Sequence, residues 1–294
     1  MQDWKGRNHI LVCLVFSLLQ TTPVLAELQY VPSRPLNGIV VVLHGCLQSA
    51  ESMALGTDMN SAADRNGWLV LYPQVPTGSN PANCWNWYDS KNQSTASGQL
   101  KEIADLVSRT QQQYKLKRKP VFITGISSGG GTAAGAISCY PSLFKAAAIH
   151  SGPVYGSAQN LNDGTLALKN GPPMPLPPRP CRPGKTAASV LVIQGLQDKV
   201  VHPDHGLRMM MDFGSAFKTI PNRENAKLIS ITSDSKSMIW KQGTQSLELI
   251  ENDKLSHAWA IKKNDPLKGP LPFFEVTSFA STELIEAFFK EHSR

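Results

Sequence analysis

The segment VFITGISSGGGTAAGAIS, residues 121–138, predicts a strand, a sharp turn and a helix in immediate succession. Residues 121–124 form an apolar, β-branched run that suits a strand buried on both faces. Gly125–Gly129 matches the pattern G-x-S-x-G, and the small residues at 130–138 are typical of a closely packed helix. Such a turn holds its middle serine in strained geometry with the hydroxyl exposed, so Ser127 is the candidate nucleophile. The alternatives are the neighbouring Ser128 hydroxyl and a glycine-rich turn without chemistry.

Similar apolar runs recur on both sides of this segment. Further strands are predicted at Gly38–Leu43, Trp68–Tyr72, Ala146–His150 and Val190–Ile193. Helical spacing of apolar residues predicts helices over Gln99–Tyr114 and Ser281–Glu291, with Ser97 and Ser281 as the expected N-caps. Alternating strands and helices predict an α/β fold with a doubly wound, mostly parallel sheet and helices on both faces.

A nucleophilic serine needs a base to take its proton, and the base needs a carboxylate to orient it. In this type of fold the chain order is serine, acid, histidine. Asp198 follows the strand at 190–193, at the sheet edge where open α/β folds bind ligands, so it is the predicted acid. Asp204 is the alternative. His257 comes later, after a strand-like run at 247–250, and is the predicted base.

The remaining histidines have simpler interpretations. His202 and His205 lie too close to Asp198 in sequence to come from a separate loop, and we expect them at the surface. A metal site formed with Asp204 is the alternative, but the predicted chemistry requires no metal or other cofactor. His150 ends a predicted strand and is expected to be a satisfied polar group near the site.

Acyl transfer passes through an oxyanion, which two backbone N–H groups should meet. One is the N–H of Ser128, the residue after the nucleophile. The other comes from the loop after the strand at 38–43, where the N–H of Cys46 is the choice. A simple strand-ending turn at His44-Gly45 is the alternative.

The N-terminus has the pattern of a secretory signal peptide over residues 1–26. Lys5 and Arg7 precede a short apolar run, ILVCLVFSLL, and the small residues around Ala26 suit cleavage after it. The run is too short for a membrane anchor, the alternative. We therefore expect a secreted or periplasmic protein without stable membrane insertion. Four cysteines remain after cleavage and predict two disulfides, whose pairing the spacing leaves open.

The composition is that of a folded chain. Of 294 residues, 41% are hydrophobic and 17% charged, and the formal net charge is +7, which excludes a disordered protein. The sequence has no stripe of Lys and Arg interleaved with aromatic residues, so it does not favour nucleic-acid binding. Residues 27–294 are predicted to form one catalytic domain. The proline-rich segment 171–184 is expected to be a surface loop, with an interdomain linker as the alternative.

Several blocks of the sequence, taken in order, resemble a known family. They are LHGC (43–46), YP (72–73), CWNWY (84–88), GISSGG (125–130), YPSLF (140–144), QGLQD (194–198) and HAW (257–259). Together they are similar to the polyhydroxybutyrate (PHB) depolymerase family of esterases, which itself resembles feruloyl and acetylxylan esterases. The resemblance spans roughly residues 36–289, and the LHGC and CWNW blocks are its most specific parts.

The resemblance implies an α/β-hydrolase fold and a triad of Ser127, Asp198 and His257. It also implies that Cys46 lies at the oxyanion hole and is paired with Cys84. The second disulfide is then Cys139–Cys181. Two positions depart from the family pattern, since Ser256 stands where Gly is usual and Gln194 where His is common.

The function that follows is a secreted serine esterase. Its expected substrate is a poly- or oligo(3-hydroxybutyrate) ester, and the alternative is a feruloyl or acetyl ester on polysaccharide. Trp85, Trp87 and Trp259 are candidates for the wall of a substrate groove, with a core role as the alternative. A non-catalytic binding protein on the same fold and a peptidase are two further candidate functions. The sequence leaves the oligomeric state open.

Overall fold

The main sheet in the described part of the chain is mixed and contains nine strands in the order β1-β3-β2-β4-β5-β6-β9-β8-β7. The structure is a computed structural model that describes residues 25, 27–183, 188–262 and 271–293. The six strands from β3 to β9 in this order pair in parallel, and β1, β8 and β7 pair antiparallel at the edges. Apart from Leu25, the predicted signal peptide lies outside the described residues.

The bounds of five strands, β2 to β6, follow the predicted apolar runs closely. The strands of the main sheet are β1 Glu27–Tyr30, β2 Gly38–Leu43, β3 Trp68–Pro73, β4 Val121–Ile126, β5 Ala146–His150, β6 Ser189–Gly195, β7 Lys227–Thr232, β8 Ser235–Gln242 and β9 Gln245–Asn252. A separate parallel pair joins β10, Trp259–Ile261, to β11, Phe274–Val276. The strands predicted from continuous apolar runs are β2 to β6, and all residues of these five are buried.

Seven α-helices accompany the strands in the described ranges. They are α1 Ala50–Gly56, α2 Met59–Asn66, α3 Gln99–Gln113, α4 Ser128–Cys139, α5 Leu161–Asn170, α6 Asp204–Phe213 and α7 Ser281–Glu291. The helices expected near 99–114 and 130–138 and at 281–291 are therefore present. Both predicted caps are wrong, because Gly98 precedes α3 and Ala280 precedes α7, and neither gives a side-chain cap. The Ser281 hydroxyl instead accepts from the Ala260 N–H.

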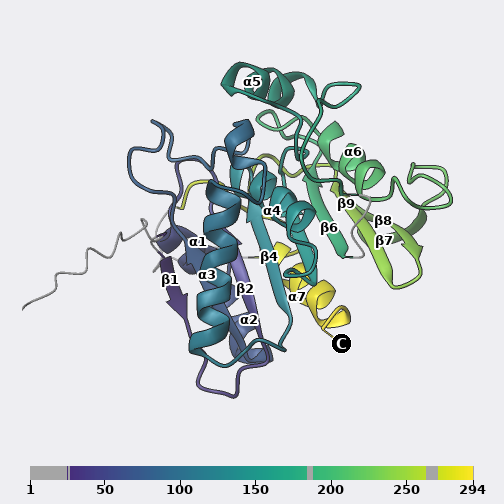
Figure 1. The fold of residues 1–294 in the computed structure, drawn as a ribbon. Helices are drawn as coiled ribbons and strands as arrows, with labels where there is room; N and C mark the ends of the chain where they lie inside the picture. The colour runs from purple at the N-terminus through teal and green to yellow at the C-terminus, as the bar shows by residue number, and fades with distance from the viewer. Residues whose placement is uncertain (1–24, 26, 184–187, 263–270, 294) are drawn as a thin grey trace, which may run out of the picture.

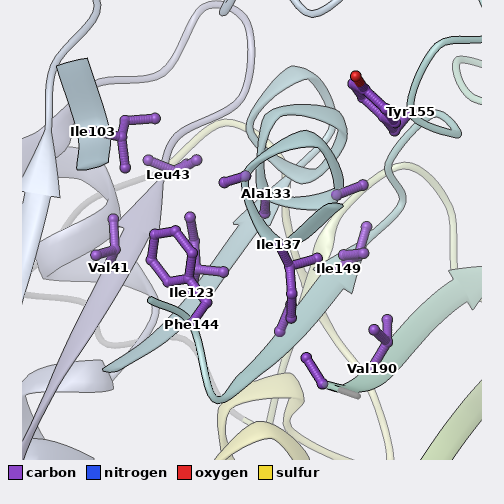
Figure 2. Packing of buried hydrophobic residues seen from close by; sticks show 14 of the residues in the cluster. Val41, Leu43, Ile103, Ile123, Ala133, Ile137, Phe144, Ile149, Tyr155 and Val190 are labelled. Carbon is purple, nitrogen blue, oxygen red and sulfur yellow. The ribbon is translucent and has the colours of Figure 1, made fainter. Parts of the chain in front are cut away.

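Two layers of helices cover the sheet, as Figure 1 shows. Alternate residues of β2 point to opposite faces, with Val41 in one core cluster and Val42 in the other. The first cluster includes Ile103 of α3 and Ala133 of α4, which Figure 2 shows, and residues of α6. The second cluster includes residues of α1, α2 and α7. The predicted fold class, an α/β fold with helices on both faces of a mostly parallel sheet, is confirmed.

Residues 171–183, the described part of the proline-rich segment, contain no α-helix and no strand. A disulfide joins Cys181 to Cys139 at the end of α4, and Arg179 forms an ion pair with Asp212 in α6. The Arg179 guanidinium also donates to the Tyr155 carbonyl oxygen at 2.6 Å. These contacts hold the segment against the body of the molecule.

Candidate active site

Ser127 occupies the sharp turn between β4 and α4. Its φ of 58° and ψ of −123° lie outside the helical and strand regions, which is the strained backbone expected of this turn. Its N–H donates to the His150 carbonyl oxygen at 3.0 Å, which ties the turn to the end of β5. A Cβ on Gly129 would lie 2.4 Å from the His44 carbonyl oxygen, so only glycine allows α4 to start this close to the end of β2. The turn therefore depends on the motif's second glycine.

Asp198 and His257 form a buried pair at the same edge of the sheet. His257 Nδ1 lies 2.8 Å from Asp198 Oδ2, and the two side chains are 8% and 0% exposed. Because an ionised carboxylate only accepts, His257 Nδ1 is the donor in this hydrogen bond. The second carboxylate oxygen, Oδ1, accepts from the N–H groups of Val200 and Val201 at 2.9 and 2.8 Å. Asp198 is thus held in one orientation.

The pKa of Asp198 is lowered from its usual value. Burial acts to raise this pKa, but the hydrogen bond and charge of His257 and the two backbone N–H groups outweigh it. Asp198 is therefore a carboxylate at neutral pH. A negative charge beside Nδ1 stabilises the imidazolium that forms when Nε2 takes a proton.

The loop that carries His257 approaches the acid closely. A Cβ on Gly195 would lie 2.2 Å from the Leu255 carbonyl oxygen, so glycine at the end of β6 makes room for this loop. The Gln197 N–H donates to the same carbonyl at 3.2 Å. β4 and β6 flank β5, which separates Ser127 from the start of the acid loop by about 10 Å at ordinary strand spacing. An imidazole between them has the right size to connect a hydroxyl and a carboxylate.

Within the described residues, no hydrogen bond joins the Ser127 hydroxyl to the His257 ring. Catalytic hydrogen bonds are often long before substrate binds. Both residues are 9% exposed, so each keeps some contact with solvent. The structure thus pairs His257 with Asp198 and places the strained Ser127 at the same edge of the sheet.

The loop after β2 lies directly against Ser127. A Cβ on Gly45 would be 3.3 Å from the Ser127 Cβ. The Gly45 N–H donates to Gln48 Oε1 at 2.8 Å, whereas no described residue accepts from the N–H of Cys46. Ser128 is the first residue of α4, where N–H groups have no partner within the helix. The two predicted oxyanion-hole donors are therefore on adjacent segments.

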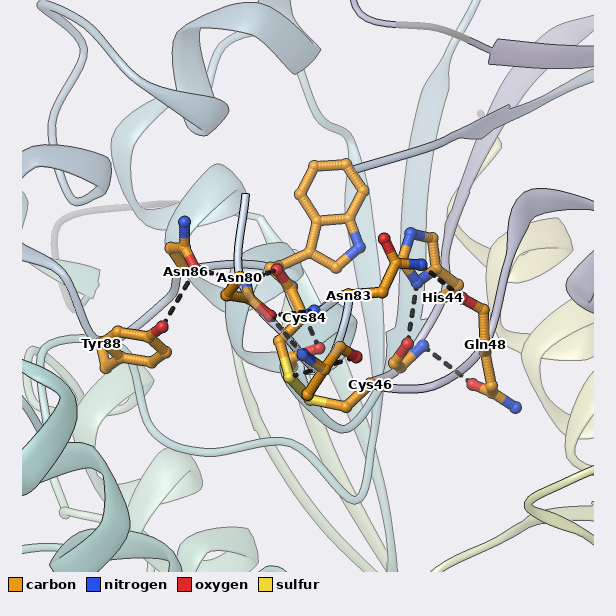
Figure 3. The surroundings of a disulfide bond; sticks show 12 residues. His44, Cys46, Gln48, Asn80, Asn83, Cys84, Asn86 and Tyr88 are labelled. Carbon is orange, nitrogen blue, oxygen red and sulfur yellow. Dashed lines mark hydrogen bonds between the residues drawn. A yellow bond between two sulfur atoms is a disulfide. The ribbon is translucent and has the colours of Figure 1, made fainter. Parts of the chain in front are cut away.

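A disulfide and two hydrogen bonds hold the β2 loop in place (Figure 3). The disulfide joins Cys46 to Cys84, the pairing that the resemblance implies. The Leu47 N–H donates to the Ala82 carbonyl oxygen at 2.8 Å, and Asn83 Nδ2 donates to the Gln48 carbonyl oxygen at 2.8 Å. These bonds fix the segment that carries the Cys46 N–H.

His44 and His150 are buried and fully bonded. Burial, the main cause, lowers the pKa of both rings, that of His150 to about 3 with help from repulsion by His257. His44 Nδ1 lies 2.8 Å from the Gly45 carbonyl oxygen, and its Nε2 accepts from the Val75 N–H at 3.2 Å. His150 Nε2 bonds the Ser281 hydroxyl at 2.8 Å. Both rings are neutral and structural, as expected for His150.

All three candidate groove tryptophans are buried. Trp85 and Trp259 are 0% exposed, and Trp87 is 7% exposed. Trp85 packs in the core near His44, and Trp259 stacks on His150 with ring centroids 5.1 Å apart. Because no surface of Trp85 or Trp259 reaches solvent, neither can line an open groove in this conformation, and their core interpretation holds.

His205 has no free nitrogen for a metal. Its Nδ1 accepts from the Val154 N–H at 3.0 Å, and its Nε2 lies 2.8 Å from the Ala167 carbonyl oxygen. The ring is 0% exposed, so the expectation of a surface position is wrong. These bonds also oppose the alternative of a metal site with His202 and Asp204.

One residue near the acid, Gln194, has no catalytic role among the sequence predictions. Gln194 Nε2 lies 3.4 Å from Asp198 Oδ2 and 3.1 Å from the Gly195 carbonyl oxygen. Gln194 is fully buried, so its amide supplies a neutral donor beside the carboxylate. Its departure from the family pattern was visible in the sequence, but its contact with Asp198 was not.

Curated proteins with similar sequences are esterases and a depolymerase. The chain is 32% identical over 152 residues to the probable acetylxylan esterase A of Aspergillus fumigatus, which covers 48% of this chain and 39% of that protein. It is 32% identical over 131 residues to feruloyl esterase B of Thermothelomyces thermophilus, covering 43% of each. It is 27% identical over 145 residues to poly(3-hydroxyalkanoate) depolymerase C of Paucimonas lemoignei, covering 49% and 35%. The chain thus spans about two fifths of the length of these relatives.

Solved structures confirm the α/β-hydrolase fold. An acetyl xylan esterase from Aspergillus awamori matches with a TM-score of 0.66 at 21% identity, over 79% of this chain and 88% of that one. A Bacillus cereus carboxylesterase matches with a TM-score of 0.55 at 12% identity, over 93% and 97%. At these identities the likeness concerns the fold.

The family assignment comes from the sequence. The model of the family described as esterase PHB depolymerase matches residues 26–171, which include the β2 loop, the CWNWY block and the Ser127 turn. This confirms the resemblance carried by the motifs. Over residues 26–171, about half of the chain, the sequence matches the esterase PHB depolymerase family.

Proposed function

We propose that this protein is a serine esterase that hydrolyses carboxylic esters through Ser127, His257 and Asp198. The observation that carries the proposal is the strained Ser127 turn at the same sheet edge as the buried His257–Asp198 pair. The matched family and the esterase relatives support the same activity.

In the proposed mechanism, Ser127 Oγ attacks the ester carbonyl while His257 Nε2 takes the hydroxyl proton. The ionised Asp198 orients the ring and stabilises the imidazolium. The N–H groups of Cys46 and Ser128 donate to the oxyanion. His257 then gives its proton to the leaving alcohol, and water attacks the acyl-enzyme with His257 as base.

Two substrate classes have support. The family description and the Paucimonas lemoignei depolymerase favour poly- or oligo(3-hydroxyalkanoate) esters, the first candidate. The acetylxylan and feruloyl esterase relatives favour esters linked to polysaccharide. Hydrolysis of hydroxybutyrate oligomers, acetylxylan and methyl ferulate should separate the two classes. The substrate of the correct class should be hydrolysed with the higher kcat/KM.

Ser127→Ala tests the chemistry on short p-nitrophenyl esters. Ser108→Ala, on the outer side of α3, is the matched control. We expect the first variant to lose hydrolysis and keep its circular dichroism spectrum, and the second to keep both. Full activity of Ser127→Ala would remove Ser127 from the mechanism.

We further propose that residues 27–294 form the catalytic domain and that the protein is exported with cleavage after Ala26. Two disulfides fit an oxidising compartment. In the described ranges, none of the helices has the length and apolarity that a membrane span requires. Leu25 is nonetheless buried among core residues. N-terminal sequencing of exported protein decides: a start at Glu27 supports cleavage after Ala26, and a start upstream of Leu25 contradicts it.

A further inference from the structure

Gln48 connects two loops that are far apart in the sequence and meet at the proposed active site. Its side chain is buried, with 3% of the residue exposed. Oε1 accepts from the Gly45 N–H at 2.8 Å, and Nε2 donates to the Pro272 carbonyl oxygen at 3.0 Å. Figure 3 shows Gln48 on the same loop as His44 and Cys46. One amide thus satisfies a donor on the oxyanion-hole loop and an acceptor 224 residues away.

The first bond sets the direction of the β2 loop. Gly45 is buried, so its N–H needs a partner, and Gln48 Oε1 provides it from inside the turn. The Gln48 N–H also donates to the Gly45 carbonyl oxygen at 3.3 Å, which closes the turn. With the Gly45 N–H committed, the donor of this loop that has no acceptor among the described residues is the N–H of Cys46, next to Gly45.

The second bond reaches the segment that touches the base. Phe273, next to Pro272, packs edge-to-face on His257 with ring centroids 5.9 Å apart. The Phe273 carbonyl oxygen accepts from the Trp259 N–H at 2.8 Å, and Phe273 has a φ of 64°. This left-handed conformation is unusual for a bulky residue and persists only where surrounding contacts impose it. The Gln48 bond to Pro272 is one of those contacts.

We propose that Gln48 is a positioning residue that holds two segments in one arrangement. They are the oxyanion-hole loop and the Pro272-Phe273 segment, which packs against His257. The proposal deepens the proposed esterase function and rests on it. An amide is required because the site needs an acceptor toward Gly45 and a donor toward Pro272 at once. Among side chains of this shape, only an amide or a protonated carboxyl group offers both.

The variant Gln48→Glu tests whether the side chain must donate to Pro272 while it accepts from Gly45. When ionised, its carboxylate accepts from the Gly45 N–H but faces the Pro272 carbonyl oxygen without a proton to donate. We expect kcat on p-nitrophenyl acetate to fall about tenfold or more at pH 8 with KM nearly unchanged, a smaller loss than removal of an oxyanion-hole donor causes. As the pH falls and the carboxyl group protonates, the ratio of variant to wild-type kcat should rise.

Gln242→Glu is the matched control. Its amide also bridges two backbone groups, accepting from the Lys218 N–H and donating to the Ala216 carbonyl oxygen, but at the far end of β8. Its kcat ratio to wild type should stay near one at every pH. A flat ratio for Gln48→Glu, or wild-type kcat at pH 8, would overturn the proposal.

Gln48→Met keeps the test decisive if the charged variant fails to fold. It removes both bonds without adding charge, so kcat should fall by a factor that does not depend on pH. Hydrogen exchange supplies a readout apart from activity, since amides at 45–48 and 271–275 should both exchange faster in this variant. If the wild type hydrolyses no ester, the proposed function fails, while coupled exchange at both segments still decides the role of Gln48. Faster exchange at only one of the two segments would contradict the positioning role of Gln48.

Discussion

His257 Nδ1 and Asp198 Oδ2 lie 2.8 Å apart, although the two residues are 59 positions apart in the chain. β6 and β9 pair in parallel, so the loops that follow them leave the sheet side by side. The Gln197 N–H bonds the Leu255 carbonyl oxygen, and this contact brings the base onto the acid. The pairing is thus a consequence of strand order.

Asp198→Asn should remove most of the activity while the fold remains. An amide cannot stabilise the imidazolium and lets the ring adopt the wrong tautomer, which lowers kcat by a factor on the order of 10⁴ in a serine triad. Steady-state kinetics on p-nitrophenyl acetate measure the loss. Asp105→Asn, an equal charge change on the exposed side of α3, should leave kcat within about twofold. Similar rates for the two variants would remove Asp198 from the site.

The two disulfides should differ in their effect on catalysis. Replacing Cys46 and Cys84 by serine frees the loop that carries an oxyanion-hole donor, so kcat should fall along with a stability loss of about 2–4 kcal/mol. Replacing Cys139 and Cys181 should cost similar stability, because that disulfide fastens the end of α4 to the proline-rich segment. The kcat of the variant that lacks Cys139 and Cys181, measured well below its melting temperature, should change little. Urea unfolding and kinetics at one temperature compare the pairs, and equal losses of kcat would refute the distinction.

Acid should destabilise the protein through its buried histidines. Burial, the largest cause in each, lowers the pKa of His150 to about 3 and that of His205 to about 4. Between these values and about 6.5, the usual histidine pKa, the unfolded chain binds protons that the folded chain does not. The free energy of unfolding should therefore decrease as the pH falls through this window, by up to about 1.4 kcal/mol per pH unit for each histidine. The lowered pKa of Asp198 acts in the same direction at lower pH.

Urea unfolding from pH 7 to pH 4 measures this slope. His205→Gln keeps a donor for the Ala167 carbonyl oxygen but cannot titrate, so its stability should vary less with pH than that of the wild type. If the free energy of unfolding of this variant varied with pH as steeply as that of the wild type, His205 would have the same pKa in the folded and unfolded chains.

Gly129→Ala should disrupt the Ser127 turn. The added Cβ would lie 2.4 and 2.6 Å from the carbonyl oxygens of His44 and Leu43, which are backbone atoms that cannot move independently. We expect a stability loss above about 2 kcal/mol, typical of severe core overpacking, together with lower kcat. Gly135→Ala on the same helix meets only side-chain atoms of Leu100 and Tyr155 at 3.2 Å and should cost less. Thermal melts rank the two variants, and the reverse order would contradict the packing argument.

The sequence predicted the buried centre of the fold well, and the physical reason is composition. The five strands from β2 to β6 are continuous apolar runs because helices cover both of their faces. β7 and β8 were missed because they are amphipathic or exposed edge strands. β7 has four exposed residues, and its polar and apolar residues match neither a buried strand nor a helix.

The candidate site was predictable where local pattern determines geometry. The G-x-S-x-G turn predicts Ser127 as the nucleophile. The chain order serine, acid, histidine, with each candidate placed after a strand, predicts Asp198 and His257, and the structure pairs these two side chains. The burial of Trp85 and Trp259 depended on tertiary packing that a motif does not reveal. Gln48 was missed for the same reason, since its partner Pro272 lies at the other end of the chain.

The central claim is that Ser127 is an activated nucleophile, and covalent labelling tests it most directly. A fluorophosphonate reacts by forming a P–O bond to the serine while fluoride leaves and the base takes the hydroxyl proton. Mass mapping of the labelled protein should place one phosphonate on Ser127, with labelling lost in Ser127→Ala and slowed in Asp198→Asn. A wild-type protein that stays unlabelled, or a label carried by another residue, would contradict the account.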